Sequence, residues 1–340
     1  MTKPAIWFPT IKANTGVDRF TIDLVKCLKL KGIQAEIAWL PLRAEYAPWS
    51  IEIPEPPKWA NIIHINSWLH KRFYKKFNLP IIVTSHGCVH DNNLLPYKTF
   101  FQKIYHQFWI KYNEINAFKY ADKITAVSQY TAQQNSIFFN LNDIMVVPNA
   151  IQDSFLKKPE KREPHAKFKL LFIGRLSQRK GADILKKIML NTDQNIHLFF
   201  TQHPEDNNFS LNELPNTTNV GWITNKKDLK NLIDQSDALI FPSRMEGMSL
   251  AVLESMARGL PIICNNSSSL PEIIQHYHNG FICSNNDIST YIDSIFLMSS
   301  SQELWQKMRI NSYQTVFKSY KLSSTVNNYV KIYETTLKSS

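Results

Sequence analysis

Short apolar runs alternate with helical patterns along the first half of the chain, and this alternation predicts a parallel sheet covered by helices. The predicted strands occupy residues 5–9, 35–40, 61–66, 80–86, 123–128 and 144–149. The first helical pattern is GVDRFTIDLVKCLKLKG, whose apolar residues recur at helical spacing. Thr15 and Asp18 at its start resemble a capping box, and Gly32 ends it.

The charged, proline-bearing segment KKPEKREPHAK at residues 157–167 has no periodicity and predicts a linker. The alternation then restarts, with strands predicted at residues 169–174, 196–201, 219–223, 238–243, 261–265 and 281–283. The fold class is therefore α/β, with two Rossmann-like, doubly wound domains that we expect to face a cleft. The domains are residues 1–160 and 161–318, and residues 319–340 form a C-terminal helix expected to pack back on the first domain.

Composition agrees with a globular protein, because 44% of the 340 residues are hydrophobic and only 20% are charged. No apolar run approaches the roughly 18 residues of a membrane span, and the apolar start reads as a first strand, so a cytoplasmic location is expected. The net charge of +11 is unevenly placed: residues 58–123 hold ten basic and three acidic residues. This segment predicts an anionic partner.

Glycines lie at or after the ends of predicted strands, where parallel sheets bind their ligands. Neither GxGxxG nor GxxxxGK[ST] is present, which argues against a dinucleotide enzyme and a P-loop hydrolase. In FIGRLSQRKGADIL, Gly174 and Arg175 end a strand, and Lys180 precedes the next helix. Two cations near a helix N-terminus suit a diphosphate, although a solvated basic loop is an equal alternative.

The stretch FPSRMEGMSLAVLESMARGLP runs from a strand into a helix expected at 250–258 and closed by Gly259. Ser249 is the predicted N-cap, so the backbone N–H groups of Met248, Ser249 and Leu250 form a candidate anion site. Glu246 precedes the helix and Glu254 lies inside it, about 12 Å away along a helix. That distance is too long for a retaining glycosidase pair at about 5–5.5 Å, so the two carboxylates are expected to contact different parts of one ligand.

These residues carry a family resemblance. GRLSQRKG, DALIFPSRMEGMSLAVLESMARGLPIIC and LPEII follow in the order typical of retaining family 4 glycosyltransferases with the GT-B fold (glycosyl transferases group 1). The chain is similar to the bacterial members that build lipopolysaccharide and surface polysaccharide. The likeness continues through TGVDRF, NIIHIN, VTSHG and VVPNAI and covers nearly the whole chain.

The resemblance implies a role for each matching residue. Residues 1–160 would take the acceptor, and residues 161–318 would bind a nucleotide-sugar. Arg175 and Lys180 would hold the donor diphosphate, Glu254 the ribose, and Glu246 the donor sugar, with Gly247 in the same loop. Gly16 would approach the phosphates and His86 the reacting centre. The base, uracil or guanine, would lie near residues 221–223, including Ile223.

Three departures from the family pattern concern loops. Thr15 and Gly16 stand where paired glycines are frequent, Asn66 stands where a second histidine is frequent, and NNSSS at 265–269 replaces glycines. The resemblance still implies transfer of a hexosyl unit with retention, a UDP-sugar being favoured. It implies no enzymic nucleophile, no cofactor and no metal. Negative charge on the leaving diphosphate would be stabilised by cations and a helix dipole.

The basic segment includes LPYKTFFQKIYHQFWIKYNEINAFKY at residues 95–120. An aromatic stripe at helical spacing includes Tyr105 and Trp109, and half of it is expected to pack on the domain. Lys98, Lys103, Lys111 and Trp109 are the candidate residues for docking on an anionic membrane or on the acceptor. We therefore expect a peripheral position on the inner face of the cytoplasmic membrane, and no nucleic-acid partner, because no nucleic-acid motif is present.

Two other functions share this architecture. A nucleotide-sugar 2-epimerase would release its product without an acceptor, and a silent scaffold domain would process no donor. Nucleotide release measured with and without acceptor separates the three.

Overall fold

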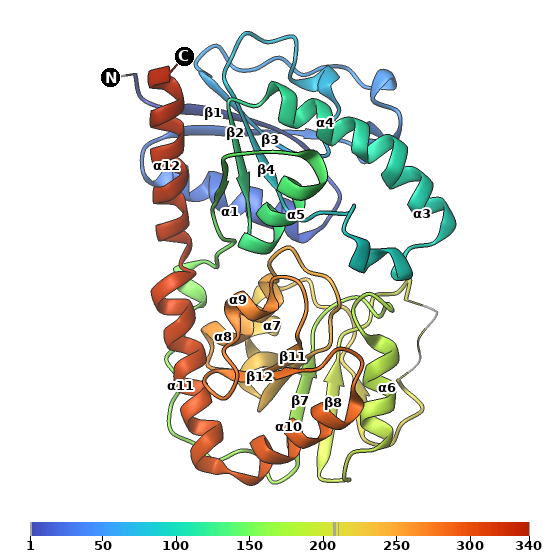
Figure 1. The fold of residues 1–340 in the computed structure, drawn as a ribbon. Helices are drawn as coiled ribbons and strands as arrows, with labels where there is room; N and C mark the ends of the chain where they lie inside the picture. Colours follow the sequence, from blue (N-terminus) through green and yellow to red (C-terminus); the bar gives the residue numbers. More distant parts are fainter. Residues whose placement is uncertain (1, 207–208, 210, 340) are drawn as a thin grey trace. The chain divides into compact units, whose positions relative to one another are not determined.

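The computed structural model describes residues 2–206, 209 and 211–339 and contains two units (Figure 1). Unit 1 comprises the residues up to Gln152 and those from Leu322 onward, and unit 2 comprises Asp153–Lys321. Each unit has a six-stranded sheet in which every pair is parallel. The predicted α/β class with two doubly wound sheets is confirmed.

The sheet of unit 1 has the strand order β2-β1-β3-β4-β5-β6. Its strands are β1 (Ala5–Ile11), β2 (Gln34–Leu40), β3 (Ile62–Asn66), β4 (Ile81–Ser85), β5 (Lys123–Ala126) and β6 (Ile144–Val146). Its helices are α1 (Gly16–Leu30), α2 (Arg43–Tyr46), α3 (Phe100–Ile104), α4 (Lys111–Tyr120), α5 (Gln129–Phe139) and α12 (Leu322–Ser339). A π-helical turn, Tyr105–Ile110, joins α3 to α4, and short 3-10 turns occupy Pro48–Ser50, Lys71–Phe73 and Asn92–Tyr97.

Both faces of this sheet are buried, because successive side chains of a strand point to opposite faces. In β1, Ile6 and Phe8 belong to the core beneath α1 and α12, whereas Trp7 belongs to the core on the other face, with Ala117 and others. Helix α12 adds Val326, Tyr329 and Tyr333, among others, to the first core. In Figure 1 this helix runs beside α1. The last segment of the chain is thus part of unit 1.

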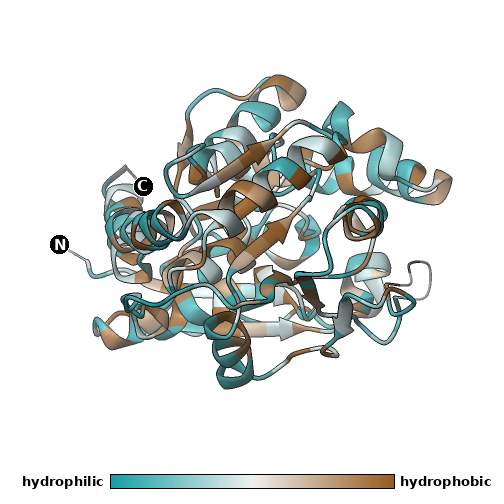
Figure 2. Cartoon of the chain, turned by 90° about the horizontal axis from the view of Figure 1, so that it is seen from below, coloured by the Kyte–Doolittle hydropathy of each residue, from teal (hydrophilic) through white to brown (hydrophobic). Residues whose placement is uncertain are grey.

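The sheet of unit 2 has the strand order β12-β11-β10-β7-β8-β9. Its strands are β7 (Phe168–Phe172), β8 (Ile196–Phe200), β9 (Thr217–Asn219), β10 (Ala238–Phe241), β11 (Ile262–Asn265) and β12 (Gly280–Cys283). Its helices are α6 (Ala182–Leu190), α7 (Lys226–Asp234), α8 (Leu250–Ala257), α9 (Leu270–Ile273), α10 (Ile288–Ser300) and α11 (Gln302–Ser319), and a 3-10 turn spans Asp153–Phe155. In Figure 2 the central strands are brown, and the helices carry both colours, as amphipathic helices require.

The segment at 157–167, predicted as a linker, is bound to unit 2. Asp237, fully buried before β10, accepts hydrogen bonds from Arg162 Nη1 at 2.8 Å and from the backbone of Lys169 at 2.9 Å. His165 Nδ1 lies 2.9 Å from the same carboxylate. The side chains of this segment therefore bind a buried aspartate. Unit 2 begins before the segment, at Asp153.

Two local predictions at strand and helix ends are wrong. The strand expected at 219–223 lies earlier in the chain: β9 spans Thr217–Asn219. It does not continue to residue 223, because Gly221 turns the chain with φ +75°. The capping box at α1 does not form: the Thr15 side chain makes no cap hydrogen bond, and Asp18 instead accepts from the N–H groups of Ala13 and Asn14 at 2.9 and 2.7 Å.

Candidate functional site

Two loops of unit 2 carry most of the predicted donor-binding residues. Strands β7 and β10 are neighbours in the sheet, and the loops that follow them, residues 173–181 and 242–249, leave from their carboxyl ends. Open parallel sheets bind ligands at this edge. We call these two segments the donor loops.

An ion pair connects the donor loops. Lys180 Nζ lies 2.5 Å from Glu246 Oε1, and Ser243 Oγ donates to the same oxygen at 2.5 Å. The ammonium group also lies 5.1 Å from the centre of the Phe241 ring, within the range of a cation–π contact. The two charged side chains are only 15% and 10% exposed. The sequence therefore named two residues that the fold brings into direct contact.

The ionisation of Glu246 follows from this pairing. Burial acts to raise the pKa of its carboxyl group, but the positive charges of Lys180 and Arg179 outweigh burial and hold the pKa below its ordinary value. Glu246 is consequently a carboxylate at neutral pH. A carboxylate accepts hydrogen bonds, as sugar hydroxyls require, and has no proton to give.

Two arginines that the sequence analysis did not single out join the donor loops. Arg179 Nη1 donates to the carbonyl of Met245 at 2.8 Å, and the N–H of Arg244 donates to the carbonyl of Arg179 at 2.9 Å. The Arg244 guanidinium binds the Asp183 carboxylate through two bonds of 2.7 and 2.8 Å and also donates to the carbonyl of Gln178. These bonds hold the two donor loops to each other.

Glycine at position 181 permits the close approach of the two loops. Its φ is +77°, and a Cβ atom there would lie 2.3 Å from the carbonyl oxygen of Pro242. Any side chain would therefore push the donor loops apart. In this motif Lys180 therefore supplies the positive charge, and Gly181 allows the backbones of the two loops to approach each other.

Arg175 lies in the same loop but faces different partners. Its Nε donates to Asp206 Oδ1 at 2.5 Å, and its Nη1 lies 3.5 Å from Glu205 Oε2. The backbone of Gly174 is held separately, because its N–H donates to Thr201 Oγ1 at 2.9 Å. Arg175 is thus bound to the loop after β8, whereas Lys180 is bound to the loop after β10, and their shared contact with a diphosphate stays a prediction.

Three serines of the segment NNSSS hold the turn that carries Glu246. Ser267 Oγ donates to the carbonyl of Ser243 at 2.8 Å, Ser268 Oγ accepts from the Glu246 N–H at 2.9 Å, and Ser269 Oγ donates to the Glu246 carbonyl at 3.2 Å. This segment is one of the three departures from the family pattern, where many members have glycines. In the structure its hydroxyl groups support the site instead.

Helix α8 begins where the sequence predicts. Ser249 is the N-cap, with its Oγ accepting from the N–H of Val252 at 3.4 Å, and Leu250 is the first helical residue. Ser249 and Met248 are buried, as is Glu254, which lies on α8 with 5% exposure. The helix ends at Ala257, one residue earlier than expected, and Gly259 follows with φ +77°. The ligand contacts predicted for these residues and for Gly247 stay predictions.

The predicted base-binding region follows β9. Ile223 is half-buried, whereas the neighbouring Trp222 is 42% exposed and meets the His203 ring edge-on at 5.0 Å. Trp222 lies within the predicted base region 221–223 but was not singled out there. An exposed indole directly after Gly221 could have been noticed, since base recognition commonly uses aromatic faces.

In unit 1, His86 and Gly16 lie where strands β4 and β1 give way to loops and helices. His86 Nε2 lies 3.0 Å from Asn66 Oδ1, so Nε2 carries the proton and Nδ1 the lone pair. Burial lowers the pKa of His86 to about 4, so the ring is neutral at physiological pH. The departure at Asn66 thus provides the partner that orients His86. Gly16 is the first residue of α1.

The candidate membrane residues divide into two groups. Lys98 Nζ donates to the carbonyl of Val89, and burial lowers its pKa. Trp109 Nε1 donates to the carbonyl of Glu45 at 2.6 Å, and Lys111 lies over the Phe138 ring at 5.0 Å. Lys103 alone of the four is exposed. Lys98 and Trp109 therefore hold unit 1 together, which differs from the expected outward role.

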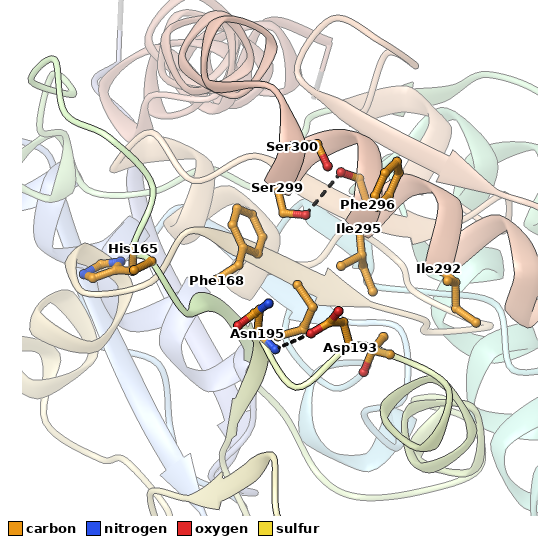
Figure 3. Close-up of a pocket in the computed structure, with 12 residues that line it drawn as sticks. His165, Phe168, Asp193, Asn195, Ile292, Ile295, Phe296, Ser299 and Ser300 are labelled. Carbon is orange, nitrogen blue, oxygen red and sulfur yellow. Dashed lines mark hydrogen bonds between the residues drawn. The ribbon is translucent and has the colours of Figure 1, made fainter.

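A cavity of about 360 Å³ lies elsewhere in unit 2, at the amino ends of β7 and β8 (Figure 3). His165 and Phe168 line it from one side and Ile295 and Phe296 from α10, and it contains none of the predicted site residues. Within the described residues, no three His, Cys, Asp or Glu side chains are grouped to hold a metal ion. Over the same part of the chain, no helix is both long and apolar enough to cross a membrane.

Comparisons with known proteins agree with the resemblance. The family model "Glycosyl transferases group 1" matches residues 153–315, and the model "Glycosyltransferase Family 4" matches residues 57–155. An uncharacterized 41.2 kDa protein in the cps region of Klebsiella pneumoniae is 28% identical over 201 residues, which cover 57% of this chain and 55% of that protein. The chain thus spans about half the length of this relative.

Two further matches differ in how much of the chain they cover. The Escherichia coli UDP-Gal:alpha-D-GlcNAc-diphosphoundecaprenol alpha-1,3-galactosyltransferase is 32% identical over 85 residues, 25% of this chain and 21% of that protein. The alignment with the crystal structure of a glycosyltransferase from Rickettsia africae ESF-5 covers 100% of this chain and 100% of that chain, with a TM-score of 0.75 and 19% identity. At that identity the structural match shows a shared fold.

Proposed function

Because this chain belongs to the group 1 glycosyl transferases of family 4, with a GT-B fold, we propose that it transfers a hexosyl unit from a nucleotide-sugar to a glycan or lipid-linked acceptor. Transfer proceeds with retention at the anomeric carbon, and UDP is the favoured nucleotide. The pathway is bacterial lipopolysaccharide or surface-polysaccharide synthesis. The K. pneumoniae relative from a cps region and the E. coli relative, whose name includes a UDP-sugar and a diphosphoundecaprenol acceptor, support these choices.

One observation carries the proposal: the ionised Glu246 carboxylate and the largely buried Lys180 ammonium group are in contact, on two loops that further hydrogen bonds hold together. Glu246 accepts hydrogen bonds from the hydroxyl groups of the donor sugar. Lys180 supplies positive charge beside the diphosphate, where negative charge grows as the sugar leaves. Preorganised loops avoid the free-energy cost of ordering these groups during the reaction.

The other predicted residues complete the donor site. Glu254, one turn inside α8, binds the ribose hydroxyls, and the N–H groups of Met248, Ser249 and Leu250 bind phosphate oxygens at the helix N-terminus. Arg175, oriented through its Nε by Asp206, contributes a second cation to the diphosphate. Ile223 and the backbone around Gly221 contact the base.

The chemical step needs no enzymic nucleophile in this proposal. The leaving diphosphate accepts the proton of the incoming acceptor hydroxyl on the same face of the sugar. Neutral His86 contacts the reacting centre on the acceptor side, and Gly16 lets the loop before α1 come close to the phosphates. Lys180, Arg175 and the dipole of α8 stabilise the negative charge, so no metal is required.

The test is to incubate the full chain with UDP- and GDP-hexoses, with and without a diphospholipid acceptor, and to follow nucleotide release. Acceptor-dependent release supports the transferase, a new sugar formed without acceptor indicates an epimerase, and no turnover with any donor indicates a scaffold. The same assay with a metal chelator tests metal independence.

Two variants connect the assay to the site. Glu254→Ala weakens nucleotide binding, and Arg175→Ala lowers turnover more than binding. Glu213→Ala removes an exposed carboxylate of the same unit, paired with Lys186 at 3.3 Å, and serves as the control that changes neither. Unchanged binding in Glu254→Ala would remove the ribose role.

A further inference from the structure

Residues 95–120 form a helical arm on unit 1 with large apolar side chains in solvent. Phe100, Phe101 and Phe108 are 71%, 81% and 73% exposed, and Ile104 is 43% exposed. Ile104 lies four residues after Phe100, three after Phe101 and four before Phe108, which puts all four on one face of the arm. We call this set the apolar face. Large apolar faces that stay exposed mark contacts with a partner or a membrane.

The side of the arm opposite this face is firmly attached to unit 1. Tyr105 Oη donates to Glu45 Oε1 at 2.8 Å, Trp109 stacks on His70 at 5.7 Å, and Ile110 is fully buried. The predicted aromatic stripe is thus divided: its inner members pack on the domain and its outer members remain in solvent. The contacts of Tyr105, Trp109 and Ile110 with unit 1 therefore keep the apolar face on the solvent side of the arm.

The charge around the apolar face identifies its partner. Residues 95–120 contain four lysines and a single acidic residue, Glu114. Glu114 is fully buried and accepts from His90 Nε2 and Ser67 Oγ at 3.0 and 3.1 Å, so no carboxylate borders the exposed face within the arm. Lys103 and Lys119 are exposed. A second copy of this chain, which carries +11, would bring like charges together, whereas an anionic bilayer complements them.

We propose that the apolar face inserts into the interface of an anionic lipid bilayer and that the acceptor is a lipid of that bilayer. This deepens the proposed function, on which the acceptor assignment rests. The apolar face supplies the burial, and Lys103 and Lys119 supply attraction to the lipid phosphates. Lys98 takes no part, because it is bound inside unit 1.

The buried side of the arm explains the choice of a membrane-held acceptor. Lys98 donates to the carbonyl of Val89, and Glu114 binds His90, so two points of the arm hold the loop that follows β4. That loop begins with His86. Because the arm and this loop are parts of one bonded assembly, inserting the apolar face also fixes the His86 loop with respect to the bilayer. A lipid-linked hydroxyl is then presented in a defined position.

Flotation with vesicles tests the insertion. The full chain is mixed with phosphatidylcholine vesicles that either contain or lack phosphatidylglycerol, and the bound fraction is converted to a partition coefficient. The double variant Phe101→Ser with Phe108→Ser lowers binding to anionic vesicles by at least about tenfold, since each ring loses its burial in lipid. The matched control, Leu30→Ser with Ile137→Ser, removes residues that are 78% and 70% exposed elsewhere on unit 1 and leaves binding unchanged.

Charge is tested separately. Lys103→Glu with Lys119→Glu lowers binding to anionic vesicles by about tenfold or more, because each cation contributes about 1 kcal/mol near such a surface. Circular dichroism confirms that every variant is folded. Wild-type protein that does not float, or a Phe101/Phe108 variant that floats like wild type, would overturn the insertion. So would a wild-type dimer, seen by sedimentation, that only this double variant dissociates.

A failure of the membrane proposal can be distinguished from a failure of the proposed transferase function. Nucleotide binding in solution is measured on the same samples, by a method that needs neither vesicles nor acceptor. Nucleotide binding without flotation rejects the insertion alone, whereas flotation without binding of any nucleotide rejects the transferase alone. Transfer to a water-soluble glycan that exceeds transfer to the lipid acceptor would overturn the assignment of a lipid acceptor.

Discussion

The donor loops of unit 2 and the helical arm of unit 1 both concentrate lysine and arginine, yet they use them in opposite ways. In the donor loops, Lys180 is largely buried and Arg244 is buried, and the two are bound to carboxylates at 2.5 and 2.7 Å. In the arm, Lys103 and Lys119 are exposed, and Lys103 lies between Phe101 and Ile104 of the apolar face in the sequence. Buried, paired charge fixes the geometry of a small polar ligand. Exposed charge beside apolar groups suits an extended anionic surface.

The donor loops and the arm differ because the donor loops are bound to other residues on several sides, whereas the bonds of the arm lie on one side. The donor loops support each other through Arg179, Arg244 and the Lys180–Glu246 pair, and the serines at 267–269 support one of them from a further side. Within the described residues, the contacts of the arm with Glu45, His70 and the loop after β4 lie on the side opposite the apolar face. Its other side carries the exposed side chains of the apolar face.

The largest effect is expected from breaking the ion pair of the donor loops. Lys180→Ala leaves Glu246 charged and buried, which typically costs 3–5 kcal/mol of unfolding free energy. Lys186→Ala, at an exposed pair with Glu213, is the matched control and costs less than about 1 kcal/mol. Urea unfolding monitored in unit 2 measures both. Adding Glu246→Gln to Lys180→Ala recovers part of the loss, and equal losses for the two lysines would contradict the buried pair.

A second effect separates the units by pH. Burial lowers the pKa of His64 to about 3 and that of His86 to about 4, against 6.5 when exposed. Such a histidine stabilises unit 1 only while neutral, so its contribution is complete above about pH 6.5 and falls as the pH drops toward the folded pKa. At pH 5 each would have lost about 2 kcal/mol. The Glu246 carboxylate, whose pKa is below 4.5, loses its contribution only at lower pH.

Hydrogen exchange with rising urea, between pH 7 and pH 5, measures this difference. Peptides from β3 and β4 are expected to lose protection before peptides from β7 and β10. His86→Gln keeps a polar side chain beside Asn66 without the titration and reduces the pH dependence of unit 1. Simultaneous loss in both units, or earlier loss in unit 2, would be inconsistent with buried neutral histidines.

The smallest effect compares helix caps in the two regions. Thr99 caps α3 in the arm, where its Oγ1 accepts from the Gln102 N–H at 3.2 Å, and Ser249 caps α8 at the donor loops. Alanine at either position costs about 1 kcal/mol of helix stability. For Thr99→Ala the loss should stay local to α3, because the arm is supported from one side. Ser249→Ala should also weaken nucleotide binding, and calorimetric titration with UDP and GDP distinguishes the two.

Much of the site could be predicted because it follows strand ends. A motif such as GRLSQRKG has to lie at the carboxyl end of β7, and FPSRMEG at that of β10, once the alternation of strands and helices is recognised. That Lys180 meets Glu246 depends on β7 and β10 being neighbours. The bonds of Arg179, Arg244 and the serines at 267–269 could not be predicted, because a basic or hydroxyl side chain in a loop has no periodicity that shows its partner.

The sequence by itself determined the two parallel sheets, the places where chemistry gathers and the excess of positive charge, since these depend on local patterns of apolar, glycine and charged residues. Only the tertiary structure decided which charges are buried. It bound Lys98 to the carbonyl of Val89, paired Arg175 with Asp206 and attached the segment at 157–167 to Asp237. It also left Phe101 and Phe108 in solvent. The reason is physical: burial and pairing depend on neighbours distant in the chain, which no local pattern specifies.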